Sequence, residues 1–328
     1  MKKINIGIIG ITGLVGQTML KVLETSKLPI NQLYVYASSR SLGKKVIFKD
    51  EELTIKELNI ETFNDPLDIV FFAVDSDLSK IYAPIAVAKG IYVIDNSSAF
   101  RMDEDIPLIV PEVNKKILKK DNYLIANPNC STIQSVVALN AIHKLFEVSE
   151  VNYSTYQAVS GSGVNGLEDL ELTSKGLNPQ FYPRPIHDNV IPHIDAFLES
   201  GFTKEEMKMV NETNKIFSTK MYITATAVRV PVKFGHSVSI HATTNKNIDL
   251  NLLLETYKHS EGIKLYLNNQ YPVPLDVQDS DLVHIGRVRM DLNFPNKILL
   301  WTVAENVRKG AASNAVQIGE YVYEEFIK

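Results

Sequence analysis

The chain has 328 residues, 45% of them hydrophobic and 22% charged, which is the composition of a globular protein too long for one ordinary core. The net charge of -4 at pH 7, without a basic stripe interleaved with aromatic residues, argues against a nucleic-acid partner. One cysteine excludes an internal disulfide bond, and no stretch reaches the ~18 apolar residues that a membrane helix needs. We therefore expect a cytoplasmic protein with no membrane partner.

The first third of the chain alternates short strands with helices. Apolar runs at residues 4–9, 33–37, 69–74 and 91–95 predict strands, and residues 13–24 have the periodicity of a helix. Runs that are apolar at every position are typical of parallel strands covered on both faces. The sequence therefore predicts an α/β, doubly wound, Rossmann-like domain.

The remainder of the chain predicts a second domain of a different kind. Residues 131–145 have helical spacing, and longer strands follow at residues 151–159, 223–230, 237–242 and 298–303. Such strands fit a mostly antiparallel sheet with helices on one side, which is an α+β domain. We expect residues 1–128, completed by a C-terminal helix at 306–328, to form the nucleotide-binding domain, and residues 129–305 to form the catalytic and dimerisation domain.

A glycine-rich turn follows the first predicted strand and opens the first helix. Its spacing is G-x-x-G-x-x-G rather than the commoner G-x-G-x-x-G. Glycines there let the backbone approach a pyrophosphate, and the helix N-terminus supplies N–H groups. A tight turn without a ligand uses glycine too, but the position at the start of a βαβ unit favours nucleotide binding. The predicted contacts are Gly10, Thr12, Gly13, Leu14, Val15 and Gly16.

The end of the second predicted strand indicates which dinucleotide is bound. An NAD site usually has an acidic residue there for the ribose hydroxyls, whereas this strand ends in Ser38, Ser39 and Arg40. Hydroxyl groups and a guanidinium suit the 2′-phosphate of NADP. A solvated loop arginine is the alternative, and we favour NADP as the cofactor.

Cys130 stands at the start of the helix predicted at residues 131–145. The helix dipole and free N–H groups favour a thiolate at that position. A lone cysteine is more often a buried structural thiol, but polar neighbours on both sides argue against that interpretation. His236, at a glycine turn entering a strand, is the candidate base. A histidine at a strand edge is often incidental, so the residues alone leave its role open.

Taken together, these motifs resemble the bacterial-type aspartate-β-semialdehyde dehydrogenases over nearly the whole chain. The order and spacing of several specific blocks agree with that family. The blocks are residues 10–16, SSAFRM at 97–102, NPNCST at 127–132, YQAVSGSG at 156–163, NVIPH at 189–193, ETNKI at 212–216, RVPVKFGHS at 229–237 and ENVRKGAA at 305–312. The family often has alanine at position 11 and aspartate at position 305, where this chain has Ile11 and Glu305.

The resemblance implies a reaction and its partners. The reaction is the reversible, NADP-dependent oxidation and phosphorylation of L-aspartate 4-semialdehyde to L-4-aspartyl phosphate, through a thioester on Cys130. Covalent catalysis of this kind divides one difficult step into two easier ones. The family serves the biosynthesis of lysine, through diaminopimelate, and of methionine, threonine and isoleucine. Its members are typically homodimers, and the resemblance implies no metal site.

The resemblance also implies residue roles. His236 aligns with the acid/base, and Gln157 with the residue that helps to hold the thioester. Arg229 aligns with the clamp on the substrate α-carboxylate, and Glu212 with the substrate-binding acid. Without the family, Glu212 and Lys215 would pass for a solvated i,i+3 helix pair. The remaining implied contacts are Arg101, Asn129 and Lys215 for phosphate, and Ser160, Gly161 and Asn306 for the nicotinamide end of NADP.

Two other functions remain as alternatives. An N-acetyl-γ-glutamyl-phosphate reductase has the same fold type and thioester chemistry, but its acylated substrate nitrogen has less need of an acid such as Glu212. A non-catalytic paralogue would be a binding module without activity. The retention of Cys130, Gln157, Arg229 and His236 argues against it.

Overall fold

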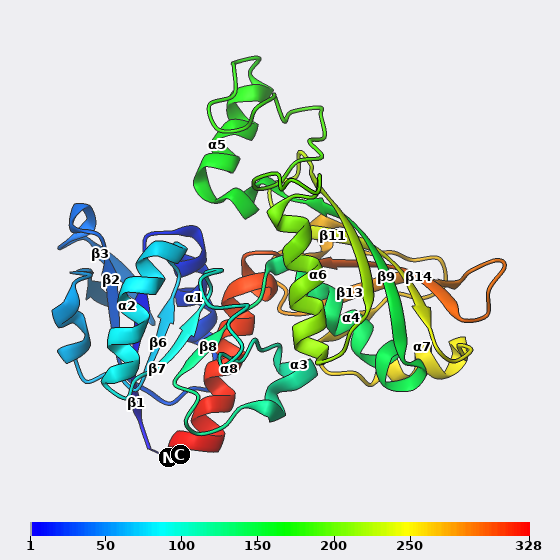
Figure 1. The fold of residues 1–328 in the computed structure, drawn as a ribbon. Helices are drawn as coiled ribbons and strands as arrows, with labels where there is room; N and C mark the ends of the chain where they lie inside the picture. Colours follow the sequence, from blue (N-terminus) through cyan, green and yellow to red (C-terminus); the bar gives the residue numbers. More distant parts are fainter. Residues whose placement is uncertain (1) are drawn as a thin grey trace. The chain divides into compact units, whose positions relative to one another are not determined.

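The computed structural model describes residues 2–328, which divide into two compact units (Figure 1). The first unit runs up to Pro128 and includes Ala311–Lys328, and the second unit is Asn129–Gly310. Each unit has its own six-stranded sheet. Among the described residues, no helix is both long enough and apolar enough to cross a bilayer.

The sheet of the first unit is parallel throughout, which confirms the Rossmann-like prediction. Its order, β5-β2-β1-β6-β7-β8, reverses direction between β1 and β6. In sheets of this type, ligands bind beyond the carboxyl ends of the strands at that reversal. The strands are β1 (Ile4–Ile9), β2 (Ile30–Ala37), β5 (Lys56–Glu57), β6 (Ile69–Phe72), β7 (Tyr92–Asp95) and β8 (Leu124–Ala126).

Helices cover both faces of this sheet. In β6, Ile69 and Phe71 join the core beneath α1 (Leu14–Thr25) and α8 (Ser313–Val322). Val70 and Phe72 join the opposite core, beneath α2 (Ser76–Ala88). Alternate side chains of a strand point to opposite faces, so a strand covered on both sides is apolar at every position.

The first unit also contains a small hairpin that the sequence patterning does not predict. Its strands, β3 (Lys45–Phe48) and β4 (Glu51–Thr54), are short and partly charged, and the turn between them has Lys49 and Asp50 at positive φ. Periodicity is a weak signal in strands of that length. The shorter helical turns are η1 (Ser39–Ser41), η2 (Ile60–Asn64), α3 (Pro111–Asn114) and η3 (Lys115–Ile117).

The second unit has a mixed sheet, and three of its five strand pairs are antiparallel, which agrees with the expectation of a mostly antiparallel sheet. The order is β10-β9-β11-β14-β13-β12, and β9–β10 and β12–β13 are parallel pairs. A parallel neighbour requires a long crossover, and α6 (Lys204–Phe217) lies in the connection from β9 to β10. The strands are β9 (Val148–Gln157), β10 (Tyr222–Arg229), β11 (His236–Thr244), β12 (Ile263–Leu265), β13 (Val283–Met290) and β14 (Lys297–Ala304).

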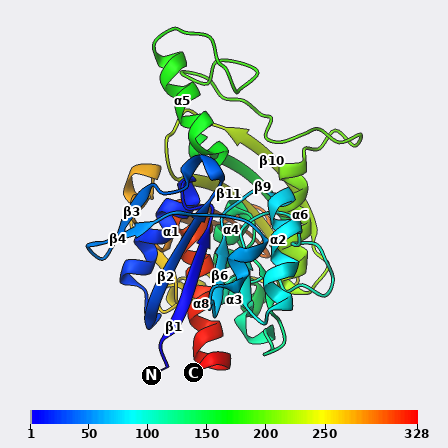
Figure 2. The ribbon, with the colours of Figure 1, turned by 90° about the vertical axis from the view of Figure 1, so that its left-hand side faces the viewer.

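Three helices, α4 (Cys130–Phe146), α6 and α7 (Leu250–Lys258), pack on this sheet. In β9, Val151, Tyr153, Thr155 and Gln157 are buried, whereas Asn152 and Tyr156, at alternate positions, are exposed. This alternation is typical of a sheet with one covered face. Within the second unit, α5 (Gly163–Ser174) and the loops after it extend beyond the sheet, at the top of Figures 1 and 2. The short elements of this unit are η4 (Val159–Ser162) and η5 (Pro274–Val277). Two π-helical turns follow in the chain: Arg308–Ala312 crosses from the second unit into the first, and Tyr323–Ile327 belongs to the first unit.

Candidate active site

The glycine turn of the first unit lies where β1 ends beside β6. Gly10 has φ +87, and a Cβ there would stand 2.3 Å from the carbonyl oxygen of Ala73. A Cβ on Gly16 would stand 2.3 Å from the carbonyl oxygen of Gly10, so only glycine permits this close approach of helix and strand. Gly13 provides α1 with no side-chain cap, which leaves backbone N–H groups at the helix start for an anion. This end of the unit therefore fits a dinucleotide pyrophosphate.

Ser38, Ser39 and Arg40 follow β2 directly, at the same carboxyl end of the sheet. All three side chains are exposed, and the backbone there forms the short turn η1. Two hydroxyl groups and a guanidinium next to a nucleotide-binding turn are suited to a phosphate.

Arg101 lies at the carboxyl ends of β7 and β8 in the first unit. Its Nε donates to the carbonyl oxygen of Asn127 at 2.9 Å, and its Nη2 donates to that of Asn96 at 2.8 Å. These bonds fix the plane of the guanidinium. Burial raises the pKa of the nearby Asp95, and hydrogen bonds from Ser97 and the charge of Arg101 oppose that shift.

Cys130 is the first residue of α4, and Asn129 caps that helix. The Asn129 Oδ1 accepts from the backbone nitrogens of Ser131 and Thr132 at 2.9 and 3.3 Å. Cys130 is partly exposed at this N-terminus, where a helix stabilises negative charge on sulfur. A Cβ on Gly310 would stand 2.8 Å from the Cys130 Cβ, so glycine at position 310 is needed for the cysteine to occupy this site.

Gln157, Arg229 and His236 meet at one edge of the second sheet. Gln157 and Arg229 end the parallel strands β9 and β10, and His236 begins β11, which is antiparallel to β9. The peptide after Gln157 joins the other two side chains. Arg229 Nη1 donates to the carbonyl oxygen of Ala158 at 2.8 Å, and the Ala158 N–H donates to His236 Nδ1 at 3.0 Å.

The hydrogen bond from the Ala158 N–H to Nδ1 determines the tautomer of His236. A ring nitrogen that accepts a hydrogen bond carries no proton, so the neutral ring holds its proton on Nε2. Burial and the neighbouring Arg229 lower the pKa of His236 to about 3, which keeps the ring neutral at physiological pH. The resting ring therefore offers a donor at Nε2, and this atom has no hydrogen-bond partner within residues 2–328. To accept a thiol proton at Nε2 while staying neutral, the ring would have to carry its own proton on Nδ1 instead. A proton on Nδ1 would break the hydrogen bond that the Ala158 N–H donates to it.

Ser160 and Asn306 form a pair beside the same edge. Asn306 Nδ2 donates to Ser160 Oγ at 3.0 Å, and its Oδ1 accepts from the Gly235 N–H at 2.9 Å. Between them and the strand ends lies Gly161. A Cβ there would come within 2.8 Å of Arg229 Nη1 and 3.1 Å of His236 Nε2, so glycine keeps both groups accessible.

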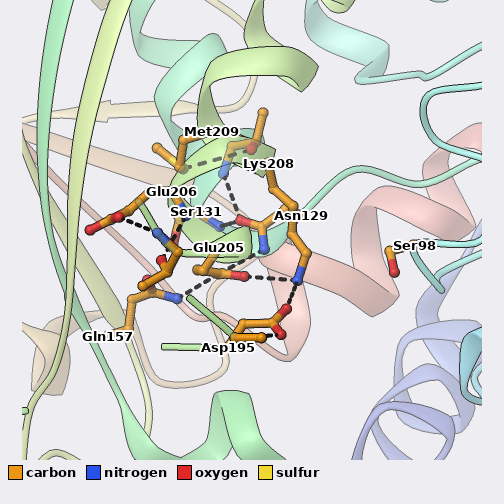
Figure 3. A network of polar contacts seen from close by, with 12 residues as sticks. Ser98, Asn129, Ser131, Gln157, Asp195, Glu205, Glu206, Lys208 and Met209 are labelled. Atoms are coloured by element: carbon orange, nitrogen blue, oxygen red, sulfur yellow. Dashed lines mark hydrogen bonds and ion pairs between the residues drawn. The ribbon is translucent and has the colours of Figure 1, made fainter. Parts of the chain in front are cut away.

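Helix α6 contributes Glu212, Lys215 and an acid that the sequence did not suggest, Glu205. Glu212 is 1% exposed and accepts from the backbone N–H of Asn129 at 2.7 Å, which rules out a solvated pair with Lys215. Lys215 lies one turn later and is partly exposed. Glu205 accepts from the side-chain amides of Asn129 and Gln157 at 2.9 and 3.0 Å (Figure 3). In the sequence, Glu205 and Lys208 have the spacing of an ordinary surface ion pair, so no pattern distinguishes them.

Two family models match the chain in series. Residues 5–121 match the semialdehyde dehydrogenase NAD binding domain, and residues 139–309 match the semialdehyde dehydrogenase dimerisation domain. The model matched by the first unit thus describes a nicotinamide cofactor site.

Relatives match over almost their full length. The aspartate-semialdehyde dehydrogenase of Aquifex aeolicus is 46% identical, with 98% of each chain covered. Aspartate-semialdehyde dehydrogenase 2 of Vibrio cholerae is 42% identical, with 99% of each covered. A crystal structure of aspartate semialdehyde dehydrogenase II from Vibrio cholerae, complexed with ASA, superposes with a TM-score of 0.94 at 40% identity, covering 99% of this chain and 100% of that one. On these matches, the chain belongs to the aspartate-semialdehyde dehydrogenase family.

Proposed function

We propose that this protein catalyses the reversible NADP-dependent oxidation and phosphorylation of L-aspartate 4-semialdehyde to L-4-aspartyl phosphate. The observation that carries the proposal is a set of hydrogen bonds within the second unit, which link the cysteine at the start of α4 to the ends of β9 and β10. Cys130 begins α4, and Asn129 next to it shares the Glu205 carboxylate with Gln157, at the strand edge that also holds Arg229 and His236. Membership of the family over the whole chain supports the same reaction.

The chemistry follows from a thiolate at a helix start. The Cys130 thiolate adds to the aldehyde carbon and gives the oxyanion of a hemithioacetal. The C=O bond of that oxyanion re-forms as the C–H hydrogen leaves as hydride, which gives a thioester. NADP⁺, when bound, supplies the hydride acceptor. A phosphate oxygen then attacks the thioester carbon, and Cys130 departs as a thiolate. Gln157 and the Nε2–H of His236 supply donors near the reacting carbonyl oxygen, where negative charge develops.

We assign the substrate carboxylate to Arg229. Its Nη1 is occupied by Ala158, but its buried Nε has no partner among residues 2–328. A buried N–H without an acceptor is costly, and a carboxylate that binds side-on to a guanidinium satisfies it. Glu212 is the proposed partner of the substrate ammonium. Arg101, Asn129 and Lys215 are the proposed phosphate contacts.

The simplest experiment follows NADPH formation from aspartate semialdehyde, with and without phosphate. We expect continuous turnover with phosphate and, without it, a burst of about one equivalent per site, because the thioester has no acceptor. N-acetylglutamate semialdehyde should give no comparable rate. Equal use of that compound would support the reductase alternative, and no burst with either aldehyde would support a non-catalytic paralogue.

The assembly and location are proposed on separate grounds. We assign cofactor binding to residues 1–128 with the C-terminal helix, and catalysis and dimerisation to residues 129–305. The sheet face bearing Tyr156 and Trp301 is the open one, and it is suited to a second copy in a homodimer. A catalytic thiolate is best preserved in a reducing compartment, so we propose the cytoplasm.

We expect the cofactor preference to depend on Arg40. Charge-assisted contacts to a phosphate contribute roughly 1.5–3 kcal/mol each, so Arg40→Ala should weaken NADP binding roughly tenfold to a hundredfold and barely change NAD binding. Ser160, Gly161 and Asn306, proposed for the nicotinamide end, would serve both cofactors equally. Titration of both cofactors into the wild type and the variant tests this. Equal losses would mean that Arg40 does not bind the 2′-phosphate.

A further inference from the structure

We propose that a cavity on the open face of the second sheet is a binding site for a small organic anion that carries a flat ring. The cavity has a volume of about 340 Å³, which lies in the range of small-molecule sites. Two cations, two aromatic rings and a hydroxyl group share it. Its lining includes Ser239, Tyr271, Pro272, Arg287, Arg289 and Trp301.

The cavity lies on the face of the sheet that turns away from the reactive cysteine. In β11, the buried Val238 and Ile240 flank Ser239, which is partly exposed, so Ser239 points to the other face. Trp301 pairs with Ser239 in the register of β14 against β11, and it is partly exposed too. Helix α4, which begins with Cys130, packs on the covered face of these strands. The cavity is therefore separate from the proposed catalytic site.

The two arginines of the cavity have no acidic partner. Arg287 and Arg289 are exposed, and neither guanidinium pairs with a carboxylate within residues 2–328. Burial and the positive charge of Arg287 lower the pKa of Arg289, which means that the two cations repel each other. Asp291 is used elsewhere, because its carboxylate lies 3.6 Å from His241 and accepts from the Asn293 N–H at 2.8 Å. A bound anion would relieve the repulsion and supply the missing partner.

A β-bulge in β13 carries one of these arginines. The register of β13 against β14 shifts between Gly286 and Arg289, opposite Trp301 and Leu299. Arg287 lies in this bulge with φ +55, a left-handed conformation that a non-glycine residue seldom adopts. Strain of this kind is concentrated at ligand sites, where the side chain is needed and the surrounding structure imposes the backbone. An arginine at a position that favours glycine therefore supports a binding role for its side chain.

The aromatic wall of the cavity is fixed in place. A Cβ on Gly286 would stand 2.6 Å from Pro272 Cδ and 3.2 Å from Tyr271 Cα, so glycine lets this loop pack directly on β13. Trp301 Nε1 donates to the Pro272 carbonyl oxygen at 3.0 Å. The Tyr156 ring packs on the indole at a centroid separation of 5.4 Å. A wall held in this way before the ligand enters reduces the entropic cost of binding.

The lining indicates the class of ligand. Guanidinium groups bind the oxygens of a carboxylate or a phosphate, and aromatic rings are suited to a flat ring. A phosphate ester and a carboxylate share this chemistry. An acidic side chain of a second copy would also satisfy the two arginines, but it would fill only part of the 340 Å³. A free anion that carries a ring uses both the charge and the volume.

The fluorescence of Trp301 tests the proposal directly, because it is the only tryptophan in the chain. Titration with phenyl phosphate or benzoate should give a saturable change with a Kd of about 1 mM or lower. The tighter of the two shows whether the site takes a phosphate ester or a carboxylate. Inorganic phosphate, which lacks the ring, and benzyl alcohol, which lacks the charge, should bind at least about tenfold more weakly. Equal affinity for either of these two would overturn the assigned chemistry.

Variants of the arginines test their part in binding. Arg287→Gln and Arg289→Gln should each weaken phenyl phosphate binding at least about tenfold, because each loses a charge-assisted contact. Arg287→Gly should do the same with no loss of melting temperature, since glycine accepts the left-handed backbone. The matched control is Lys297→Gln, which removes a cation of the same sheet that lies over the Phe294 ring and should change the affinity less than about twofold. Equal weakening in this control would reveal a general effect of charge and contradict the site.

The binding measurement needs no turnover, so its outcome is independent of the proposed reaction. Arg229→Leu, which removes the proposed substrate clamp, should bind phenyl phosphate as the wild type does. Loss of the fluorescence change in Arg229→Leu would assign the anion to the catalytic site and refute the cavity. If a second copy fills the cavity instead, wild-type protein should show no saturable change, and Arg287→Gln should weaken the dimer in sedimentation equilibrium. That pair of results would also overturn the proposal.

Discussion

Replacing Cys130 with alanine should reduce turnover by at least ~10³-fold, because the covalent route through the thioester is lost. The thiol is the only one in the chain, and it stands at the first residue of a helix that Asn129 caps. The measurement is the initial rate of NADPH formation, together with the burst in the absence of phosphate, which should also disappear.

The same variant should fold and bind NADP almost normally. Cys130 is partly exposed and Gly310 packs on its Cβ, which alanine retains. A matched control is Ser135→Ala, which removes a buried hydroxyl from the same helix, where the Ser135 Oγ donates to the Ser131 carbonyl oxygen. That control should keep nearly all of the activity. Near-normal turnover by Cys130→Ala would refute the thioester mechanism.

Replacing Arg229 with leucine should lower kcat/KM for the semialdehyde by roughly 10²–10⁴-fold, because two charge-assisted hydrogen bonds of ~1.5–3 kcal/mol each are lost. Arg229 has a buried Nε without a partner within residues 2–328, and its Nη1 bonds to Ala158. The loss should persist at every phosphate concentration. Arg229→Lys should recover only part of it, because an ammonium retains the charge but lacks the planar fork.

Lys215→Ala provides the contrast, since it should mainly affect phosphate. Glu212 and Lys215 lie three residues apart on α6, on one face of the helix. We expect a raised phosphate KM, partial recovery at excess phosphate and an intact burst without phosphate. Initial rates over a grid of both substrate concentrations distinguish the two variants. Loss of the burst in Lys215→Ala with an unchanged phosphate KM would contradict this division between the two cations.

The tautomer of His236 modifies the expected chemistry in one respect. The resemblance implies a base that takes the thiol proton, and that role stays a prediction. The bond from the Ala158 N–H makes the resting ring a donor at Nε2. A donor there matches the stage at which a carbonyl oxygen becomes negative. The register of β9 against β11 brings Ala158 to the imidazole ring. The residues next to His236 in the sequence do not predict this hydrogen bond.

The amino-acid sequence by itself determined the Rossmann-like architecture and the location of its glycine turn. Strands such as β6 are apolar at every position because both faces of the sheet are covered, and that pattern is local and readable. The turn is readable too, because the close approach at Gly10 and Gly16 tolerates no Cβ. Cys130 could be identified for the same reason, since a helix start is a local feature.

Only the tertiary structure decided which polar side chains share a hydrogen bond. The parallel pairing of β9 with β10 depends on a crossover more than sixty residues long, and periodicity contains no information about it. Glu205 has the sequence spacing of a solvated ion pair with Lys208, yet it is buried against two amides from distant segments. Burial and partner choice arise from long-range packing, whereas sequence patterning reports only the neighbours along one helix or strand.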